Sequence, residues 1–231
     1  MTVSKSQIPI GKNIKYMFEM KSLKLHFESL LDDDDDFYDP EIDKKVIENW
    51  IKDNYNFSGK LTISDDFVVD CDKYIYVKNR HITSLTNGLF RWGYVGDGFN
   101  CSYCKNLTSL EGAPEKNKGN FHCTNCDNLS SLEGAPKEVS GVFYCNRCNN
   151  LTSLKGAPEK VDGGFHCGDC ENLKSLEGAP KKVGGGFYCK KCEKLKSLKG
   201  APEKVGGGFD CRDCDNLKIT DSDRKKYKIK Y

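Results

Sequence analysis

GGFHCGDCENLKSLEGAPKKVGGGFYCKKCEKLKSLKGAP, residues 163–202, contains nearly the same 22-residue unit twice. Over a longer stretch the first cysteine of a Cys-x-x-Cys pair recurs every 22 residues, and so does the second. The first cysteines are Cys101, Cys123, Cys145, Cys167, Cys189 and Cys211, and the second are Cys104, Cys126, Cys148, Cys170, Cys192 and Cys214. A short fixed period is typical of a solenoid, in which each repeat forms one coil and stacking buries a shared core.

Each repeat carries a strand signal ahead of its first cysteine. In VGGGFYC, residues 183–189, alternate positions fall on one face, which is the period of a β-strand. Val183, Gly185, Phe187 and Cys189 form that face. A turn, two leucines and Gly-Ala-Pro follow, and the proline stops any helix from continuing. We therefore expect stacked coils with a parallel β-sheet and a core of Phe, Cys and Leu columns.

The pattern F-x-C-x-x-C-x-x-L-x-S-L resembles the leucine-rich repeat, with Phe and the first Cys at leucine positions and the second Cys at the N/C position. The resemblance covers roughly residues 74–218, and the wording NLTSLEGAP with GGFYC is similar to short repeats of tailed-phage proteins. It implies a β-rich α/β solenoid, a leucine-rich-repeat-like right-handed stack with a parallel sheet and an N-terminal helical cap. The extra residue after the second Cys and the short return leg depart from the common repeat, so a parallel β-helix is the alternative.

The cysteines fit either a zinc site or a packed core. Two Cys-x2-Cys pairs separated by 18 residues match zinc-ribbon spacing. Residues 74–85 align with 99–110, however, and there Tyr76 replaces the first Cys and Asn79 the second. Neither is a thiolate ligand, and the first Cys lies in phase with a core Phe. Free cysteine behaves as a small buried hydrophobic side chain, so we predict packed thiols and no metal or other cofactor, with zinc as the alternative.

If Phe and Cys point inward, the residue between them points outward on the sheet. Down the stack this column contains two histidines and two tyrosines, and the next outward column becomes basic toward the C-terminus. Tyrosines are common anchors of protein interfaces. We predict that a partner binds at these columns, through Asn100, His122, Tyr144, His166, Tyr188 and Asp210 in the first and Lys190 and Arg212 in the second. Ring stacking that only stabilises the sheet is the simpler interpretation of the same pattern.

The two ends of the array differ from its middle. Residues 1–59 are expected to form a helical N-terminal cap, with one helix over 12–31, an acidic linker over 32–36 and a second helix over 39–54 that begins at Pro40. Residues 60–98 are expected to contain short strands and a degenerate first repeat, residues 99–218 six repeats, and residues 219–231 a basic C-terminal cap or tail. Residues 181–231 hold 15 Lys or Arg against 7 Asp or Glu, a net charge of +8 in a chain of +2.

Composition and motifs restrict the function. No apolar run is long enough for a membrane helix and the N-terminus lacks a secretory pattern, so we expect a cytoplasmic protein whose 13 cysteines stay reduced. His122 and His166 each precede a cysteine, but adjacent strand residues point to opposite faces, so neither forms a catalytic pair. We therefore expect a non-enzymatic protein.

Three functions are compatible with this organisation. The first is a protein-binding solenoid that uses its exposed sheet face; the phage resemblance adds a phage-encoded inhibitor of a host protein, such as a defence nuclease. The second is a zinc-stabilised nucleic-acid-binding protein that uses the basic C-terminal coils. The third is a structural or self-assembling component.

Overall fold

The computed structural model describes residues 40–230, with side chains from residue 43. The chain forms two compact units, residues 1–50 and 51–231. Helix α2 (Pro40–Asn54) confirms the helix predicted over 39–54, and its side chains Ile47, Trp50 and Ile51 are buried. The predicted helix over 12–31 and the acidic linker over 32–36 lie outside the described residues.

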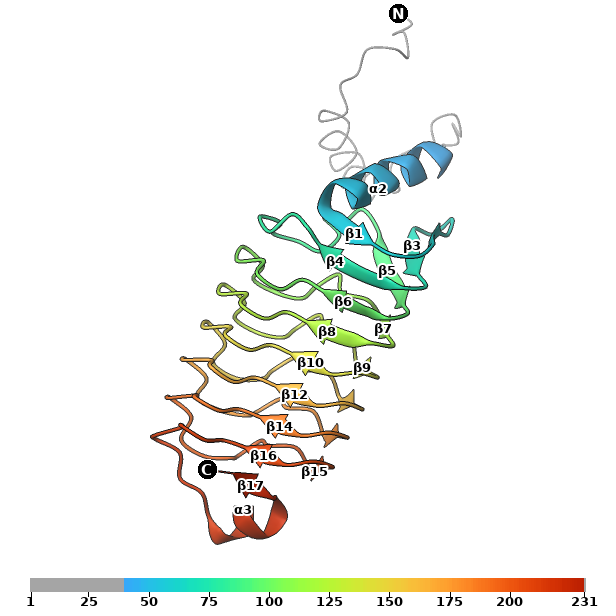
Figure 1. The fold of residues 1–231 in the computed structure, drawn as a ribbon. Coiled ribbons are helices and arrows are strands. Elements are labelled where there is room, and N and C mark those ends of the chain that lie inside the picture. Colours follow the sequence, from blue (N-terminus) through green and yellow to red (C-terminus); the bar gives the residue numbers. More distant parts are fainter. Residues whose placement is uncertain (1–39, 231) are drawn as a thin grey trace, which may run out of the picture. The chain divides into compact units, whose positions relative to one another are not determined.

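Residues 51–230 form a parallel β-solenoid, in which successive coils stack in one direction (Figure 1). Its nine-stranded sheet, here called sheet A, is parallel except at β1, which pairs antiparallel with β4. In spatial order its strands are β1 (Tyr55–Phe57), β4 (Tyr74–Val77), β6 (Gly98–Asn100), β8 (Asn120–His122), β10 (Phe143–Tyr144), β12 (Phe165–His166), β14 (Phe187–Tyr188), β16 (Phe209–Asp210) and β17 (Ile229–Lys230). The predicted stack of coils with a parallel sheet is therefore confirmed.

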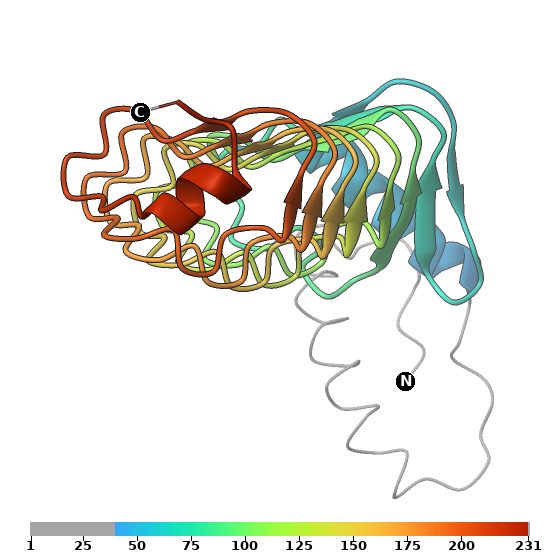
Figure 2. The ribbon, with the colours of Figure 1, turned by 90° about the horizontal axis from the view of Figure 1, so that it is seen from below.

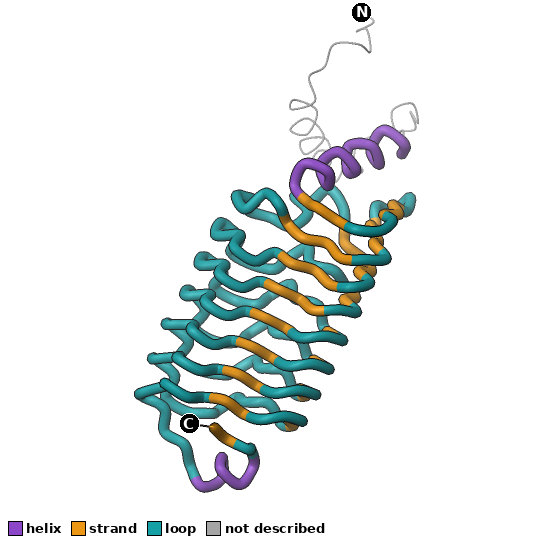
Figure 3. Tube along the Cα trace, viewed as in Figure 1, coloured by secondary structure: helices purple, strands orange, loops and turns teal. Residues whose placement is uncertain are grey.

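A second sheet of eight strands, here called sheet B, runs along another side of the coils. It is parallel apart from the β2–β3 pair. Its strands, in spatial order, are β15 (Lys204–Val205), β13 (Lys182–Val183), β11 (Lys160–Val161), β9 (Glu138–Val139), β7 (Lys116–Asn117), β5 (Arg91–Val95), β3 (Val68–Cys71) and β2 (Leu61–Ile63). Two parallel sheets also fit the alternative of a parallel β-helix. The strands of both sheets gather toward one end of each coil, and loops form the opposite end (Figures 2 and 3).

The core consists of identical side chains stacked from coil to coil. The phenylalanine rings that precede the first cysteines are fully buried, and neighbouring rings lie 4.9–5.6 Å apart between centroids. They are Phe99, Phe121, Phe143, Phe165, Phe187 and Phe209. Stacked aromatic pairs add about 0.5–1.5 kcal/mol each to the free energy of burial. Both leucine columns and all 13 cysteines are also buried, except that Leu217 of the last coil is half-buried.

The strand predicted over residues 183–189 is in fact two strands in different sheets. Val183 ends β13 in sheet B and Phe187 begins β14 in sheet A, with a bend at Gly184 and Gly185 between them. A Cβ on Gly184 would lie 2.1 Å from the Asp162 carbonyl oxygen of the preceding coil. At the next position a Cβ on Gly185 would lie 2.9 Å from the Gly163 carbonyl carbon, and glycine stands at this position in five coils, at 119, 141, 163, 185 and 207. The corner therefore requires glycine at this second position.

Each Cys-x-x-Cys turns the chain through a left-handed residue. The residue before the second cysteine has φ between 55° and 65° in all six coils, although three of these residues are neither Asn nor Asp. The positions are Tyr103, Asn125, Arg147, Asp169, Lys191 and Asp213. A left-handed non-glycine residue costs about 1–2 kcal/mol, so the stacked ladder on both sides of the turn imposes this backbone.

The degenerate first coil has a different register from the one we predicted. Ile75 pairs with Phe99 and Tyr76 pairs with Asn100, so Val77, fully buried, takes the first-cysteine position. Tyr76 therefore points outward, and its assignment to the cysteine position was wrong. Asn79 does match the second cysteine, because its carbonyl accepts the Ile82 amide as the Cys104 carbonyl accepts the Leu107 amide.

The C-terminal segment closes sheet A. Helix α3 (Asp221–Lys226) begins with a capping box between Thr220 and Asp223, and β17 then pairs in parallel with β16. The Tyr227 ring lies 4.8 Å from Phe209 and ends the phenylalanine column, and its hydroxyl donates to the Pro202 carbonyl. The basic segment over 219–231 is thus built into the solenoid.

Candidate functional site: an aromatic ladder on sheet A

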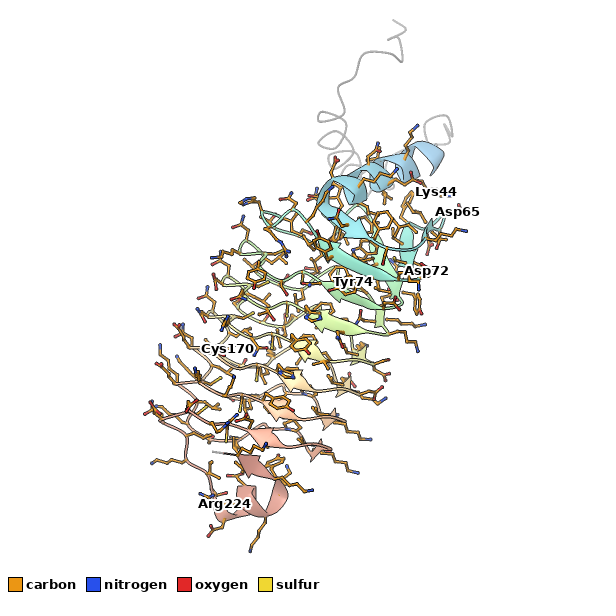
Figure 4. The ribbon with its side chains drawn as sticks, in the orientation of Figure 1. Lys44, Asp65, Asp72, Tyr74, Cys170 and Arg224 are labelled. Atoms are coloured by element: carbon orange, nitrogen blue, oxygen red, sulfur yellow. The ribbon has the colours of Figure 1, made fainter. Side chains whose placement is uncertain are left out.

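The predicted outward column forms one straight row across sheet A. Each member pairs in register with the equivalent residue of the next coil. The row contains Asn100, His122, Tyr144, His166, Tyr188 and Asp210, and the pairing extends it to Tyr76 at one end and Lys230 at the other. Figure 4 shows the rows of side chains that result, with Tyr74 labelled on β4.

The four rings of this row stack on one another. Centroids lie 4.5 Å apart for His122 and Tyr144, 4.7 Å for Tyr144 and His166, and 4.2 Å for His166 and Tyr188. Interplanar angles are 10°, 33° and 23° in the same order. We call these four residues the aromatic ladder. Imidazole and phenol rings alternate along it, and all four side chains are half-buried.

Because the ring faces contact each other, the ladder offers ring edges to a partner. Glycine two residues earlier makes room for two of the rings, those of His166 and Tyr188, whereas Asn120 and Val142 stand at this position before His122 and Tyr144. A Cβ on Gly186 would lie 2.5 Å from the Tyr188 hydroxyl oxygen, and one on Gly164 would lie 3.2 Å from His166 Nε2. Ring edges carry partial positive charge. The ladder can therefore contact carbonyls, carboxylates and the faces of aromatic rings. A ligand cannot stack on the ring faces within the ladder, because neighbouring rings cover them.

Burial lowers the pKa of both ladder histidines. For His122 desolvation is the cause, and for His166 desolvation is reinforced by the Lys190 ammonium. Both imidazoles are therefore neutral at pH 7, and each has one nitrogen that donates and one that accepts a hydrogen bond. The ladder is an uncharged strip with hydrogen-bonding groups along its edge.

The second outward column becomes charged only at its C-terminal end. It runs Ser102, Thr124, Asn146, Gly168, Lys190 and Arg212, and only its last two members are exposed. Arg212 binds the Asp210 carboxylate through Nε at 2.9 Å and a terminal nitrogen at 2.8 Å. This bidentate pair leaves Asp210 6% exposed and lowers its carboxyl pKa. Of the predicted contacts, Asp210 is thus already engaged within the chain, while the Lys190 side chain is exposed.

An arginine and two tyrosines extend the site toward the N-terminal coils. The Arg80 guanidinium lies 5.8 Å from the Tyr76 ring centroid and 5.7 Å from that of Tyr103, and it also donates to the Ser102 carbonyl. Tyr103 is 55% exposed. Sequence reasoning missed this cluster because Tyr76 was placed in a core position. The buried residues on both sides of Tyr76, Ile75 and Val77, are the signal that would have placed it correctly.

The second cysteines form a ladder of their own. In five consecutive coils the thiol lies 3.1–3.3 Å from the backbone carbonyl of the first cysteine one coil earlier and donates to it. Burial raises the pKa of the first-column thiols Cys145 and Cys167, and that of Cys170 to about 12. Within residues 40–230, no group of three or more His, Cys, Asp or Glu side chains is arranged to hold a metal ion.

Comparison of the chain with protein-family models, with curated proteins and with solved structures found no match. Among the helices of the described part of the chain, none combines the length and apolar character needed to cross a membrane.

Proposed function

We propose that this protein is a non-enzymatic protein-binding solenoid, and that its partner docks on the exposed face of sheet A along the aromatic ladder. The observation that carries the proposal is the row of four half-exposed, mutually stacked rings. Tyrosine is enriched among the residues that dominate binding energy at protein interfaces. Extended solenoid surfaces are commonly used for such binding.

The rigidity of the ladder favours binding. Tyr144 and His166 are each held between two rings, and His122 and Tyr188 are each stacked on one. The strands beneath are hydrogen-bonded on both sides, as in Cys123 N to Tyr144 O at 2.8 Å and Cys145 N to His166 O at 2.8 Å. A side chain that is already ordered loses little conformational entropy when a partner covers it, whereas ordering a free side chain costs about 0.5–1.5 kcal/mol. The ladder is thus prepared for contact before the partner arrives.

The surroundings of the ladder suggest which surface the partner offers. At one end lies the Tyr76–Arg80–Tyr103 cluster, and at the other lies the exposed side chain of Lys190, next to the Arg212–Asp210 pair. A neutral strip between cationic ends suits a partner surface with carbonyl and aromatic groups in the middle and carboxylates at its ends. A phage-encoded inhibitor that covers a host protein is a role consistent with this surface, and it rests on the repeat resemblance alone.

A triple substitution tests the proposal. The full chain would be used to capture partners from cells of its source, and the partner, once identified, would be titrated against Tyr144→Ala/His166→Ala/Tyr188→Ala. A matched control is Glu138→Ala/Lys160→Ala/Lys182→Ala, which removes three consecutive exposed side chains from sheet B. We expect the first variant to lose at least about 100-fold in affinity and the control to keep it. Equal affinity of the two variants, with both folded by circular dichroism, would refute the proposed face.

The salt dependence of the captured complex separates this proposal from the nucleic-acid alternative. Binding through neutral ring edges weakens little between low and moderate salt, whereas binding to phosphates falls steeply. A captured nucleic acid with a steep salt dependence would replace the protein-binding proposal.

A further inference from the structure

The aromatic ladder ends one coil before sheet A does. After Tyr188 the next residue of the row is Asp210, and its carboxylate is turned to Arg212 rather than along the ladder. Among the described residues, His166 is the only ring stacked on Tyr188. The other face of the Tyr188 phenol points toward β16 without a ring against it.

The backbone beneath this position is open. In the two preceding coils the equivalent glycines, Gly164 and Gly186, are buried next to the rings of His166 and Tyr188. Gly208, which follows them in the column, is half-exposed, and a Cβ there would meet only the Lys228 carbonyl oxygen, at 3.9 Å. Neighbouring strands of a sheet lie about 4.8 Å apart. A ring stacked on Tyr188 at the ladder spacing would therefore lie directly over β16.

The surroundings of this space are basic. Strand β17 places Lys230 opposite Asp210 and brings Lys228 beside Gly208, and both lysine side chains are exposed. Neither lysine forms an ion pair with another residue in the described part of the chain, and the exposed Lys190 side chain lies two residues after Tyr188, beyond the end of β14. The Asp210 carboxylate on β16 is already neutralised by Arg212.

We propose that the space over Gly208, between the Tyr188 ring and the lysines of β17, binds a nucleotide. The base takes the place of the missing ring, and the phosphate contacts the ammonium groups of Lys228 and Lys230. The alternation of the ladder favours a nitrogen heterocycle, because each tyrosine ring of the aromatic ladder stacks on an imidazole. The slot accommodates one base, since the ladder closes one side and the last strand of the sheet the other.

This site shares Tyr188 with the proposed partner face but does not depend on that proposal, and four probes test it. Adenosine 5′-monophosphate, adenosine, inorganic phosphate and a four-nucleotide single strand would each be titrated into the ¹⁵N-labelled full chain and followed by NMR. For the monophosphate we expect a dissociation constant on the order of 1 mM or below, with ring-current shifts at the amides of residues 207–210. Adenosine and phosphate alone should each bind at least about ten-fold more weakly.

Gly208→Val is the decisive variant. Valine already occupies the equivalent position 142, and a Cβ on Gly208 meets no clash, so the fold should be kept while the space is filled. We expect at least about a ten-fold loss of monophosphate binding, whereas Lys160→Ala, which removes an exposed side chain from sheet B, should leave binding unchanged. Asp210→His, which supplies a ring to the ladder, should also block the nucleotide and provides a second blocking variant if valine disturbs folding.

Three results would overturn the inference. They are monophosphate binding that survives both Gly208→Val and Asp210→His, equal affinity for phosphate and for the monophosphate, and affinity that rises with strand length. The first would place the site elsewhere, the second would reduce it to an anion contact, and the third would make it part of a strand-binding surface.

Discussion

Variants at two cysteines can distinguish the hypothesis that the thiols are packed in the core from the hypothesis that they bind zinc. Cys148 and Cys167 are both fully buried, but their hydrogen bonding differs. The Cys148 thiol lies 3.1 Å from the Cys123 carbonyl oxygen and donates to it. The Cys167 thiol, by contrast, donates no hydrogen bond among the described residues. Serine should therefore be less destabilising than alanine at position 148, and alanine less destabilising than serine at position 167.

The magnitudes follow from what each change removes. Cys148→Ala loses apolar contact comparable to one methylene, about 0.8 kcal/mol, and removes the donor to a buried carbonyl, which costs about 1–3 kcal/mol. Cys148→Ser keeps a donor, so we expect a loss of about 2–3 kcal/mol for alanine and about 1 kcal/mol for serine. At Cys167 alanine should cost about 1 kcal/mol, and serine, which buries an unpaired hydroxyl, about 2–3 kcal/mol.

Guanidinium denaturation followed by circular dichroism, under reducing conditions and with and without a zinc chelator, measures these differences. We expect the ranking to reverse between the two positions and the chelator to leave every midpoint unchanged. Zinc ligation predicts another pattern, since neither serine nor alanine replaces a thiolate. Equally severe losses for all four variants, together with a midpoint that the chelator lowers, would refute the packed-thiol interpretation.

Three further predictions concern the turns, the ladder and the thiols. Gly156→Ala should lower the free energy of unfolding by more than about 2 kcal/mol, measured by denaturation, because φ is 84° and the new Cβ would lie 2.3 Å from the Glu133 amide nitrogen; wild-type stability would contradict the stacking described. Burial lowers the pKa of His122 and His166 in the folded chain, so the unfolded chain binds more protons. Stability should therefore be constant above about pH 6.5 and fall as the pH drops below it, and His122→Gln/His166→Gln should flatten this fall; an unchanged slope in the double variant would assign the effect to other groups. The Cys170 thiol, with a pKa raised to about 12, should resist iodoacetamide at about pH 8 until the chain is unfolded, as followed by mass spectrometry; rapid native alkylation would show that the coils open locally.

The stacked coils and the two faces of sheet A could be predicted from the sequence because equivalent positions of a strict repeat have the same environment, and the same residue pattern therefore occurs several times. Phe165 and Cys167 recur with one residue between them, which is sufficient to place His166 on the outside. The second sheet escaped prediction for a physical reason. Glycine has no side chain, so a run of glycines shows no alternation of buried and exposed side chains. The bend at Gly184 and Gly185 therefore cannot be predicted from periodicity.

The ends of the array were harder to predict because their residues occur once. Tyr76 stands in a coil that is one residue shorter than its neighbours before the Leu-x-Ser-Leu segment, so alignment from that segment shifts its strand by one position. The engagement of Asp210 by Arg212 and the closure of the phenylalanine column by Tyr227 depend on contacts between neighbouring coils that no local pattern encodes.

The in-register pairing of equivalent residues also bears on how such a chain changes during evolution. Every interior coil offers the same upper and lower surface, as the Phe143–Phe165 and Phe165–Phe187 stacks illustrate. Duplication or loss of one 22-residue unit by unequal recombination therefore creates a core junction that the protein already contains. The number of repeats can therefore change while the two terminal segments stay the same, and each added repeat lengthens the surface available for recognition.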